Sequence, residues 1–317
     1  MIKLSVIIPT RNRAEILKQA LESLVQQKLS QNSFEVIVVD NGSTDKTKEI
    51  VDSFLNKISN LVYIYDDNPG LHIGRHRGLE AAQSDILVYG DDDIEALSTW
   101  LEAIMESFED ESVVLVGGKN LPNFESTPPE WITQMWESGN DKKVLGYLSV
   151  LDFGDEVKEI KPNYVFGCNF SIRKNILLES GGFHPDGMPQ EIIKYRGDGE
   201  SYVSKYIESM GYKTIYNPKA SVYHLCSTNR MKKEYFAKRA YNQAISESYS
   251  AIRESRKINL LKRKIKYFIK KNILNRDTQI EKYYLDGFTY HQNEAKKDKK
   301  LMEWIKRDSY IKNGNIK

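Results

Sequence analysis

The sequence predicts an α/β protein built on a mostly parallel, doubly wound sheet. Short apolar segments at residues 4–9, 34–39, 61–65 and 86–89 alternate with segments at 14–27, 45–58 and 73–82 whose apolar residues recur at helical spacing. Apolar strands separated by amphipathic helices are typical of a parallel sheet covered by helices on both faces. We therefore expect the polar residues that end these strands to meet along one sheet edge, where ligands bind in this class of fold.

The rest of the chain predicts fewer strands and more helix. We expect a helix at 96–108, strands at 113–116, 164–166 and 213–216, a helix at 202–210, and an irregular stretch at 120–162. After residue 229 the pattern changes to long basic helices, roughly 232–273 and 281–312. The expected division is a body over 1–229, with a further boundary between 118 and 119, and a helical extension over 230–317.

Charge is distributed unevenly between these two parts. The whole chain has 46 Lys+Arg, 44 Asp+Glu and a net charge of +2. Residues 230–317 hold 24 of those cations and 10 of the acids, so the extension is strongly basic and the body is acidic. A basic extension favours an anionic partner.

The chain reads as cytoplasmic. It begins directly with a strand rather than a signal sequence, and no apolar run approaches the length of a membrane span. Its two cysteines, Cys168 and Cys226, form no spaced framework and are expected to be reduced.

The triplet Asp91-Asp92-Asp93 follows the strand at 86–89 directly. Adjacent carboxylates repel one another, which is tolerated where a divalent cation or the hydroxyl groups of a ligand gather. A solvated acidic turn before the next helix is the alternative, and the triplet alone leaves both interpretations open.

Other strand ends supply further candidates. Thr10 and Arg11 follow the first strand, and Asp40 and Asn41 follow the second; Asp40 suits a base imide, or it simply caps the next helix. No Walker loop or dinucleotide fingerprint is present. Arg75, near a predicted helix start, is suited to a diphosphate.

A second acidic cluster contains Asp198 and Glu200, separated by a glycine just before a helix. Such carboxylates suit a general base that accepts a proton from a hydroxyl, or they cap the helix. His224 ends an apolar strand, where an imidazole is either a ligand or an ordinary buried residue.

Taken together, these segments resemble family 2 glycosyltransferases of the GT-A fold over residues 3–239. The resemblance rests on Val6 to Arg13, Val38 to Asp45, the aspartate triplet, Gly181-Gly182-Phe183, Gly197 to Glu200, and the run from Gly211 to His224. It implies a nucleotide-sugar half at 1–118 and an acceptor half at 119–229. Where many members have Ala-Arg-Asn-x-Gly, this chain has Gly74-Arg75-His76-Arg77-Gly78.

The resemblance also implies a function and a set of roles. The donor would be a nucleotide-diphospho-sugar, most simply UDP-linked, with Mn²⁺ or Mg²⁺ as cofactor. Asp93 and His224 would bind the metal, and Glu200, or its rival Asp198, would act as the base in an inverting single displacement. The donor-binding residues implied are Pro9, Thr10, Arg11, Asp40, Asn41, Arg75, Asp91 and Asp92, with Asp40 at the uracil and Asp91 at the ribose or sugar.

The acceptor is expected to be a glycan or a lipid-linked molecule of polysaccharide or cell-envelope biosynthesis. Cys168 and Asn169 lie in a loop that resembles the family's acceptor loop, and Trp131 either stacks on a sugar ring or packs in the protein. Residues 256–276 form a basic amphipathic helix that rests on the inner face of a membrane or packs on the body; the residues leave both open.

Three other functions compete with the glycosyltransferase interpretation. An Asp-dependent phosphotransferase should carry its Asp-x-Asp pair after the first strand, whereas here the pair follows the fourth. A non-catalytic sugar-binding protein need not keep every expected carboxylate, and this chain keeps them. Nucleic-acid binding by the extension is not expected, because no recognisable motif is present.

Overall fold

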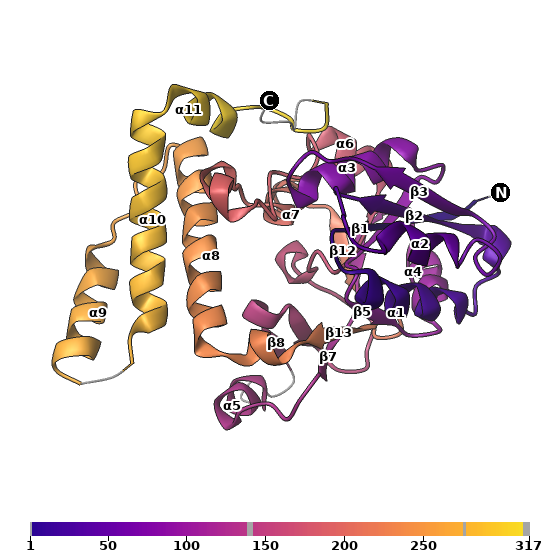
Figure 1. The fold of residues 1–317 in the computed structure, drawn as a ribbon, viewed down its shortest axis with the longest axis horizontal. Helices are drawn as coiled ribbons and strands as arrows, with labels where there is room; N and C mark the ends of the chain where they lie inside the picture. Colours follow the sequence, from indigo (N-terminus) through magenta and orange to yellow (C-terminus); the bar gives the residue numbers. More distant parts are fainter. Residues whose placement is uncertain (1, 138–141, 275–276, 313–317) are drawn as a thin grey trace.

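The computed structural model describes residues 2–137, 142–274 and 277–312, and within them its centre is an eight-stranded sheet (Figure 1). The strands of this sheet are β1 (Leu4–Thr10), β2 (Phe34–Asp40), β3 (Leu61–Tyr65), β4 (Ile86–Gly90), β6 (Val113–Gly117), β10 (Lys158–Glu159), β11 (Asn169–Arg173) and β12 (Lys213–Tyr216). Their order is β10-β12-β6-β11-β4-β1-β2-β3. Strands β3, β2, β1 and β4 are parallel, and β11 runs antiparallel to both of its neighbours. The predicted mostly parallel α/β sheet is confirmed.

Helices cover both faces of this sheet, because alternate residues of each strand point to opposite sides. On one side Val6 and Ile8 share a buried cluster with Leu17, and on the other Ile7 packs with Leu79. The first cluster lies under α1 (Ala14–Val25), α2 (Thr47–Asp52) and α4 (Trp100–Ser107); the second lies under α3 (Leu71–Ala81), α6 (Lys174–Glu179) and α7 (Glu200–Met210). Gly78 allows α3 to approach β1, since a Cβ there would lie 2.2 Å from Ile7 Cγ2.

A second sheet of five strands lies beside the first, in the order β5-β13-β7-β9-β8. Its strands are β5 (Ile94–Ala96), β7 (Asn120–Phe124), β8 (Lys143–Leu145), β9 (Val150–Asp152) and β13 (Val222–Cys226), and α5 (Glu130–Glu137) follows β7. The register places His224 of β13 opposite Ile94, and Ile94 directly follows the aspartate triplet. The sheet thereby brings residue 224 back to the end of β4.

Several predicted boundaries in this part of the chain were wrong. The helix predicted at 96–108 begins at Trp100, because Ile94–Ala96 pairs with β13 instead. The stretch at 120–162 is not irregular, since it supplies strands to both sheets. The strand predicted at 164–166 is replaced by a 3-10 turn at Pro162–Tyr164, and the true strand starts at Asn169.

The extension consists of α8 (Lys233–Arg253), α9 (Leu261–Asn272), α10 (Gln279–Lys297) and α11 (Lys299–Ile305), rather than two long helices. The helix predicted at 232–273 is interrupted after α8, because Ser255 adopts a positive φ of 53°. The helix predicted at 281–312 is interrupted at Asp298, which caps α11. Helices α8 and α10 run side by side (Figure 1). Gly287 makes this approach possible, because a Cβ there would lie 2.5 Å from the backbone oxygen of Tyr241.

The end of the described chain returns to the body. His76 Nδ1 of α3 donates to the carbonyl oxygen of Tyr310 at 3.2 Å, and its Nε2 accepts from the backbone N–H of Phe183 at 3.0 Å. A Cβ on Gly182 would lie 2.6 Å from Ile311 Cγ1, so glycine is needed for this contact. Residues 308–311 and α3 therefore form one packed unit.

Candidate active site

Two adjoining cavities open at the carboxyl ends of β1 and β4. The strand-end cavity, of about 250 Å³, is lined by Pro9, Thr10, Arg11, Arg13, Asn41, Gly70, Leu71, Asp91, Asp92 and Gly187. The α8 cavity, of about 510 Å³, is lined by residues that include Leu71, Arg75, Asp91, Cys168, Arg196, Asp198, Glu200, Arg239 and Ser250. Leu71 and Asp91 belong to both walls. Asp91 therefore stands at the junction of the two cavities.

The strand-end cavity collects most of the donor-binding residues predicted from the sequence. Pro9, Thr10 and Arg11 come from the end of β1, Asn41 follows β2, and Asp91 and Asp92 follow β4. Asp40 is not among its lining residues. The Asp40 carboxylate accepts from the Ser43 N–H and from the Tyr63 hydroxyl, each at 2.7 Å.

The three aspartates of the triplet have different surroundings. Asp91 is partly exposed, whereas Asp92 and Asp93 are buried. Asp92 accepts from the Thr10 hydroxyl at 2.7 Å and from Arg13 at 2.5 Å. Asp93 forms ion pairs with Arg13 and Arg230, each at 2.8 Å, and its Oδ1 lies 3.2 Å from His224 Nε2.

This charge cluster shifts the titration of its members. Burial alone would raise the pKa of Asp93, but His224, Arg230 and Arg13 outweigh burial and hold that pKa well below its usual range. Burial opposes a charged imidazole, yet Asp93 raises the pKa of His224 to about 9. The His224 imidazolium, Arg13 and Arg230 thus balance the charge of Asp93 together.

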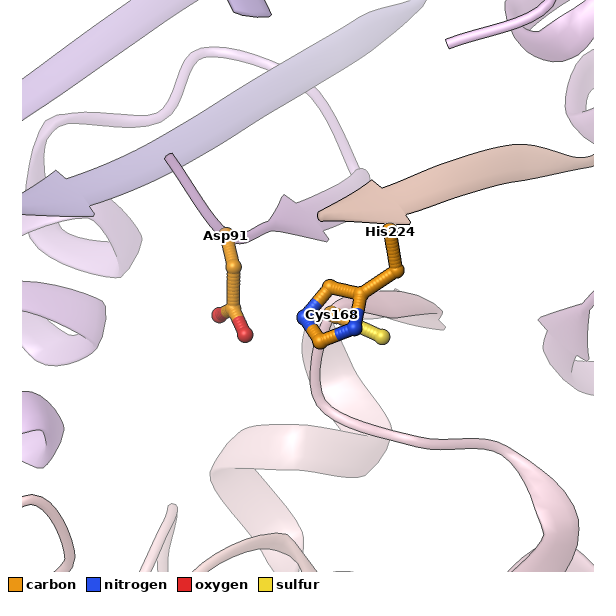
Figure 2. A group of neighbouring side chains, drawn as sticks. All are labelled: Asp91, Cys168 and His224. Carbon is orange, nitrogen blue, oxygen red and sulfur yellow. The ribbon is translucent and has the colours of Figure 1, made fainter. Parts of the chain in front are cut away.

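The donors gathered here fit a divalent metal ion. Asp91, Cys168 and His224 offer ligand atoms that all lie within 4.8 Å of one another (Figure 2). His224 Nδ1 donates to the carbonyl oxygen of Leu148 at 2.8 Å, which leaves Nε2 directed at the acidic cluster. Asp93 Oδ1 is buried without a well-formed hydrogen bond. Carboxylates with an imidazole suit Mn²⁺ or Mg²⁺, whereas burial raises the pKa of the Cys168 thiol well above normal and makes it a poor ligand for such hard ions.

Glu200 begins α7 and faces the α8 cavity. It follows Gly199, whose φ of 54° is a conformation that glycine adopts readily. The Arg75 guanidinium is buried and lies 3.3 Å from the Glu200 carboxylate, 3.3 Å from the Gly167 carbonyl oxygen and 3.8 Å from Asp91. Arg75 was predicted to face a diphosphate. In the structure its guanidinium contacts two carboxylates and a backbone carbonyl oxygen, and it lines the α8 cavity rather than the strand-end cavity.

Asp198 also lines the α8 cavity, but its carboxylate is already engaged. Its Oδ1 accepts from His184 Nδ1 at 2.6 Å, and its Oδ2 accepts from the Ser250 hydroxyl at 2.6 Å and from Lys205 at 3.3 Å. Burial would raise the pKa of Asp198, but the His184 hydrogen bond and these other donors lower it. The arrangement ties the loop before Glu200 to α8 and leaves Glu200 with the freer carboxylate.

Two of the predicted acceptor residues lie outside both cavities. Asn169 is buried; its side chain accepts from Trp100 Nε1 and donates to the Ala220 carbonyl oxygen, each at 2.9 Å. Trp131 packs edge-on against Phe236, with ring centroids 4.8 Å apart. These contacts favour the packing interpretation of Trp131. Of the three predicted acceptor residues, Cys168 lines the α8 cavity, next to Gly167.

The structure also places residues at the site that the sequence did not single out. Arg13 forms ion pairs with Asp92 and Asp93, Arg230 forms one with Asp93, and Arg239 of α8 faces the α8 cavity. Arg13 stands in the same run as Thr10 and Arg11, which was a usable signal. Arg230 and Arg239 belong to a segment full of basic residues, where no local pattern separates a site residue from a solvated one.

The parallel-rich sheet, with an acidic strand end beside two adjoining cavities, has the architecture of a GT-A glycosyltransferase. The family profile described as "Glycosyl transferase family 2" matches residues 5–181, and the chain belongs to this family. It is therefore an enzyme of the glycosyltransferase class.

Relatives and solved structures agree with this assignment. The glucosyl-dolichyl phosphate glucuronosyltransferase of Haloferax volcanii is 24% identical over 250 residues, covering 77% of this chain and 76% of the relative. Glycosyltransferase AglE of the same organism is 34% identical over 170 residues, or 50% of this chain and 55% of AglE.

Two solved structures share the fold. Mannosyltransferase PcManGT of Pyrobaculum calidifontis, in complex with GDP-Man and Mn²⁺, superposes with a TM-score of 0.54 at 18% identity over 98% of this chain and 84% of its own. The Staphylococcus aureus TarS fragment 1–349 with UDP-GlcNAc gives 0.54 at 16% identity over 93% and 92%.

Proposed function

We propose that this enzyme transfers a sugar from a nucleotide-diphospho-sugar, most simply UDP-linked, to a hydroxyl of a glycan or lipid-linked acceptor. One observation carries the proposal: Asp91, at the junction of the cavities, and Glu200, in the α8 cavity, are held by the same buried Arg75. A donor in the strand-end cavity would present its sugar at this junction, with the acceptor on the side of Glu200. The solved relatives with GDP-Man and with UDP-GlcNAc support a donor of this class.

On the donor side, strand ends supply the contacts. Pro9, Thr10, Arg11 and Asn41 would surround the nucleotide, and Asp91 would accept from a ribose or sugar hydroxyl. Asp92 would act indirectly, by fixing Thr10 and Arg13. Asp40 as the uracil acceptor requires that the nucleotide base displace the Tyr63 hydroxyl from its carboxylate.

Asp93, His224 and Asp91 would hold the divalent cation. When bound, Mn²⁺ or Mg²⁺ stabilises the negative charge that develops on the departing diphosphate. Arg13 and Arg230 reduce the repulsion among the carboxylates, so the cluster stays folded around its own charges. In the ion-free cluster, protonated His224 would add to the positive charge of Arg13 and Arg230, and ion binding would release its proton.

On the acceptor side, Glu200 would accept the proton of the attacking hydroxyl. Arg75 orients the Glu200 carboxylate, and Asp198 positions the loop that carries it. Attack from the α8 cavity on a sugar held from the strand-end side is a single displacement, which inverts the anomeric configuration. Arg239 and Cys168 would line the acceptor path.

These roles modify the predicted domain organisation. Residues 1–118 would form the donor half, and the acceptor half would include α8 in addition to 119–229, because residues of α8 line the α8 cavity. None of the helices in the described part of the chain is long and apolar enough to cross a bilayer. We place the enzyme at the cytoplasmic side of a membrane, where lipid-linked acceptors are accessible.

The proposal is tested by incubating the protein with UDP-glucose, UDP-N-acetylglucosamine or GDP-mannose and Mn²⁺, and measuring nucleotide release and melting temperature. A glycosyltransferase is stabilised by one donor and slowly releases its nucleotide diphosphate, and Asp91→Asn weakens both effects. Stabilisation without any release, even with added membrane extract as acceptor, would instead indicate a binding protein. Phosphate transfer to an aspartate would indicate a phosphotransferase.

A further inference from the structure

Helix α9 is attached to the rest of the extension through its polar side. It lies along the outer side of α10, with α10 between it and α8 (Figure 1). The Arg263 guanidinium lies 4.0 Å from the ring centroid of Tyr284 and 3.7 Å from the Glu247 carboxylate, and Lys270 forms an ion pair with Glu281. Cationic side chains therefore anchor α9 to α8 and α10.

The apolar side of α9 points away from the protein. Its apolar residues recur at three- and four-residue spacing and form one stripe, which lies opposite Arg263 and Lys270 around the helix. Every member is exposed: Leu261 by 59%, Ile265 by 49%, Phe268 by 59%, Ile269 by 39% and Ile273 by 68%. A surface helix normally buries this stripe against the core, so α9 has the reverse orientation.

The stripe and the adjacent Leu274 form the densest run of exposed large hydrophobic side chains along the described sequence. Of the fourteen large hydrophobic side chains that are exposed there, six lie between Leu261 and Leu274. A concentrated exposed apolar patch marks a surface that contacts a protein partner or a membrane.

The charge around the stripe distinguishes between these two kinds of partner. The segment from Arg256 to Leu274 contains eight Lys and Arg and no Asp or Glu. Among the described residues, no carboxylate lies within 4 Å of Lys262, Lys264, Lys266 or Lys271, which flank the stripe. A second copy of this chain would bring a second cationic face to the contact and would be repelled, whereas anionic lipid headgroups match it.

We propose that α9 lies in the plane of an anionic bilayer surface, with its apolar stripe among the acyl chains and its flanking lysines at the lipid phosphates. Helices with this combination of faces bind the interface without spanning it. The segment that leads from α8 into α9 contributes Arg256 and Ile258 to the wall of the α8 cavity. The bilayer would therefore lie close to that cavity, where, resting on the proposed function, a lipid-linked acceptor is used.

The test is co-sedimentation of the full-length protein with vesicles of phosphatidylcholine alone or mixed with phosphatidylglycerol. We expect binding to the mixed vesicles only, and release at high salt. Phe268→Glu should weaken vesicle binding about tenfold or more, because a buried phenyl ring is replaced by a charge. Lys264→Gln and Lys271→Gln should each weaken it about fivefold.

Two controls separate lipid contact through α9 from a general effect of surface charge and from a folding defect. Leu178→Glu changes a comparably exposed leucine on α6 and should leave vesicle binding unchanged. Nucleotide release from the donor without vesicles should be the same in Phe268→Glu and wild type, so a defect in catalysis is recognised separately. The proposal is overturned if the wild type stays in the supernatant with anionic vesicles, or if Phe268→Glu binds them as the wild type does. It is also overturned if the wild type binds no lipid and light scattering shows a dimer that Phe268→Glu dissociates.

Discussion

Replacement of Glu200 by glutamine tests the assignment of the general base. The change keeps the size of the side chain and an oxygen that still accepts from Arg75, at 3.3 Å in the wild type. It removes the ability to take a proton from the acceptor hydroxyl. A positioned general base contributes about 10²- to 10⁴-fold to a rate. We therefore expect kcat for transfer to fall by that factor, or about 3–5 kcal/mol of transition-state stabilisation.

The same substitution should leave two other quantities nearly unchanged. Glu200 lines the α8 cavity and not the strand-end cavity, so the Kd of the donor should stay within about twofold, roughly 0.4 kcal/mol. The free energy of unfolding should change by less than about 1.5 kcal/mol, because the glutamine amide oxygen replaces one acceptor of Arg75. Nucleotide release with a saturating acceptor, donor titration and thermal melting measure the three quantities.

Asp198→Asn is the matched comparison, two residues away in the same loop. Here one hydrogen bond to a buried carboxylate is lost, to His184 or to Ser250, and stability should fall by about 1.5–3 kcal/mol. Because folding lowers the pKa of Asp198, this stabilisation is present above its ordinary value of about 4 and is lost as pH falls further. The melting curves of variant and wild type should therefore converge in acid. If Asp198→Asn instead abolishes turnover at an unchanged melting temperature while Glu200→Gln stays active, Asp198 is the base and the assignment is wrong.

Three further predictions address packing, the metal and the acceptor. Gly78→Ala should lower the free energy of unfolding by about 1–3 kcal/mol, because its Cβ would lie 2.2 Å from Ile7 Cγ2. Gly146→Ala is the control and should melt as the wild type does, because its Cβ would meet no atom within 4 Å. Equal melting temperatures of the two variants would refute the packing argument. Chelation by EDTA should stop nucleotide release. Added Mn²⁺ should raise the melting temperature of the wild type and of Cys168→Ser, but not that of His224→Ala. If Mn²⁺ also stabilises His224→Ala, that histidine is not a ligand. Arg239→Gln should raise the KM for acceptor and leave donor hydrolysis unchanged, and an altered donor KM would contradict its placement.

The central sheet was predictable because its strands are buried on both faces. Val36 to Val39 are all fully buried, so the sequence shows a continuous apolar run that no surface strand requires. The polar ends of β1, β2 and β4 then follow from parallel pairing alone. Thr10, Asn41 and Asp91 line one cavity at this edge, whereas Asp40, the predicted polar end of the second strand, does not line it.

The second sheet was not predictable in the same way. Its strands are short, and β5 (Ile94–Ala96) contains one exposed residue between two buried ones, a pattern that also fits the start of a helix. Pairing with β13, more than a hundred residues later, decides the outcome. The local sequence does not identify such a distant pairing strand, so the helix predicted at 96–108 began too early.

Side-chain partners were also hidden from the sequence. Arg75 belongs to a motif that suggested a diphosphate, yet burial directs its guanidinium to Glu200 and Asp91. Asn169 belongs to a loop that resembles an acceptor site, yet its amide bonds Trp100 and Ala220. In both cases the type of residue was informative, while its direction depended on the packing of distant elements.

The contact between Tyr310 and His76 has a consequence for biosynthesis. Helix α3 borders the strand-end cavity through Leu71, and its packing is completed by Tyr310, which follows His76 by 234 residues in the chain. A nascent chain can assemble the sheet early, but His76 stays without this partner until residue 310 has left the ribosome. A chain truncated before Ser309 should thus have a lower melting temperature than the chain that carries Tyr310.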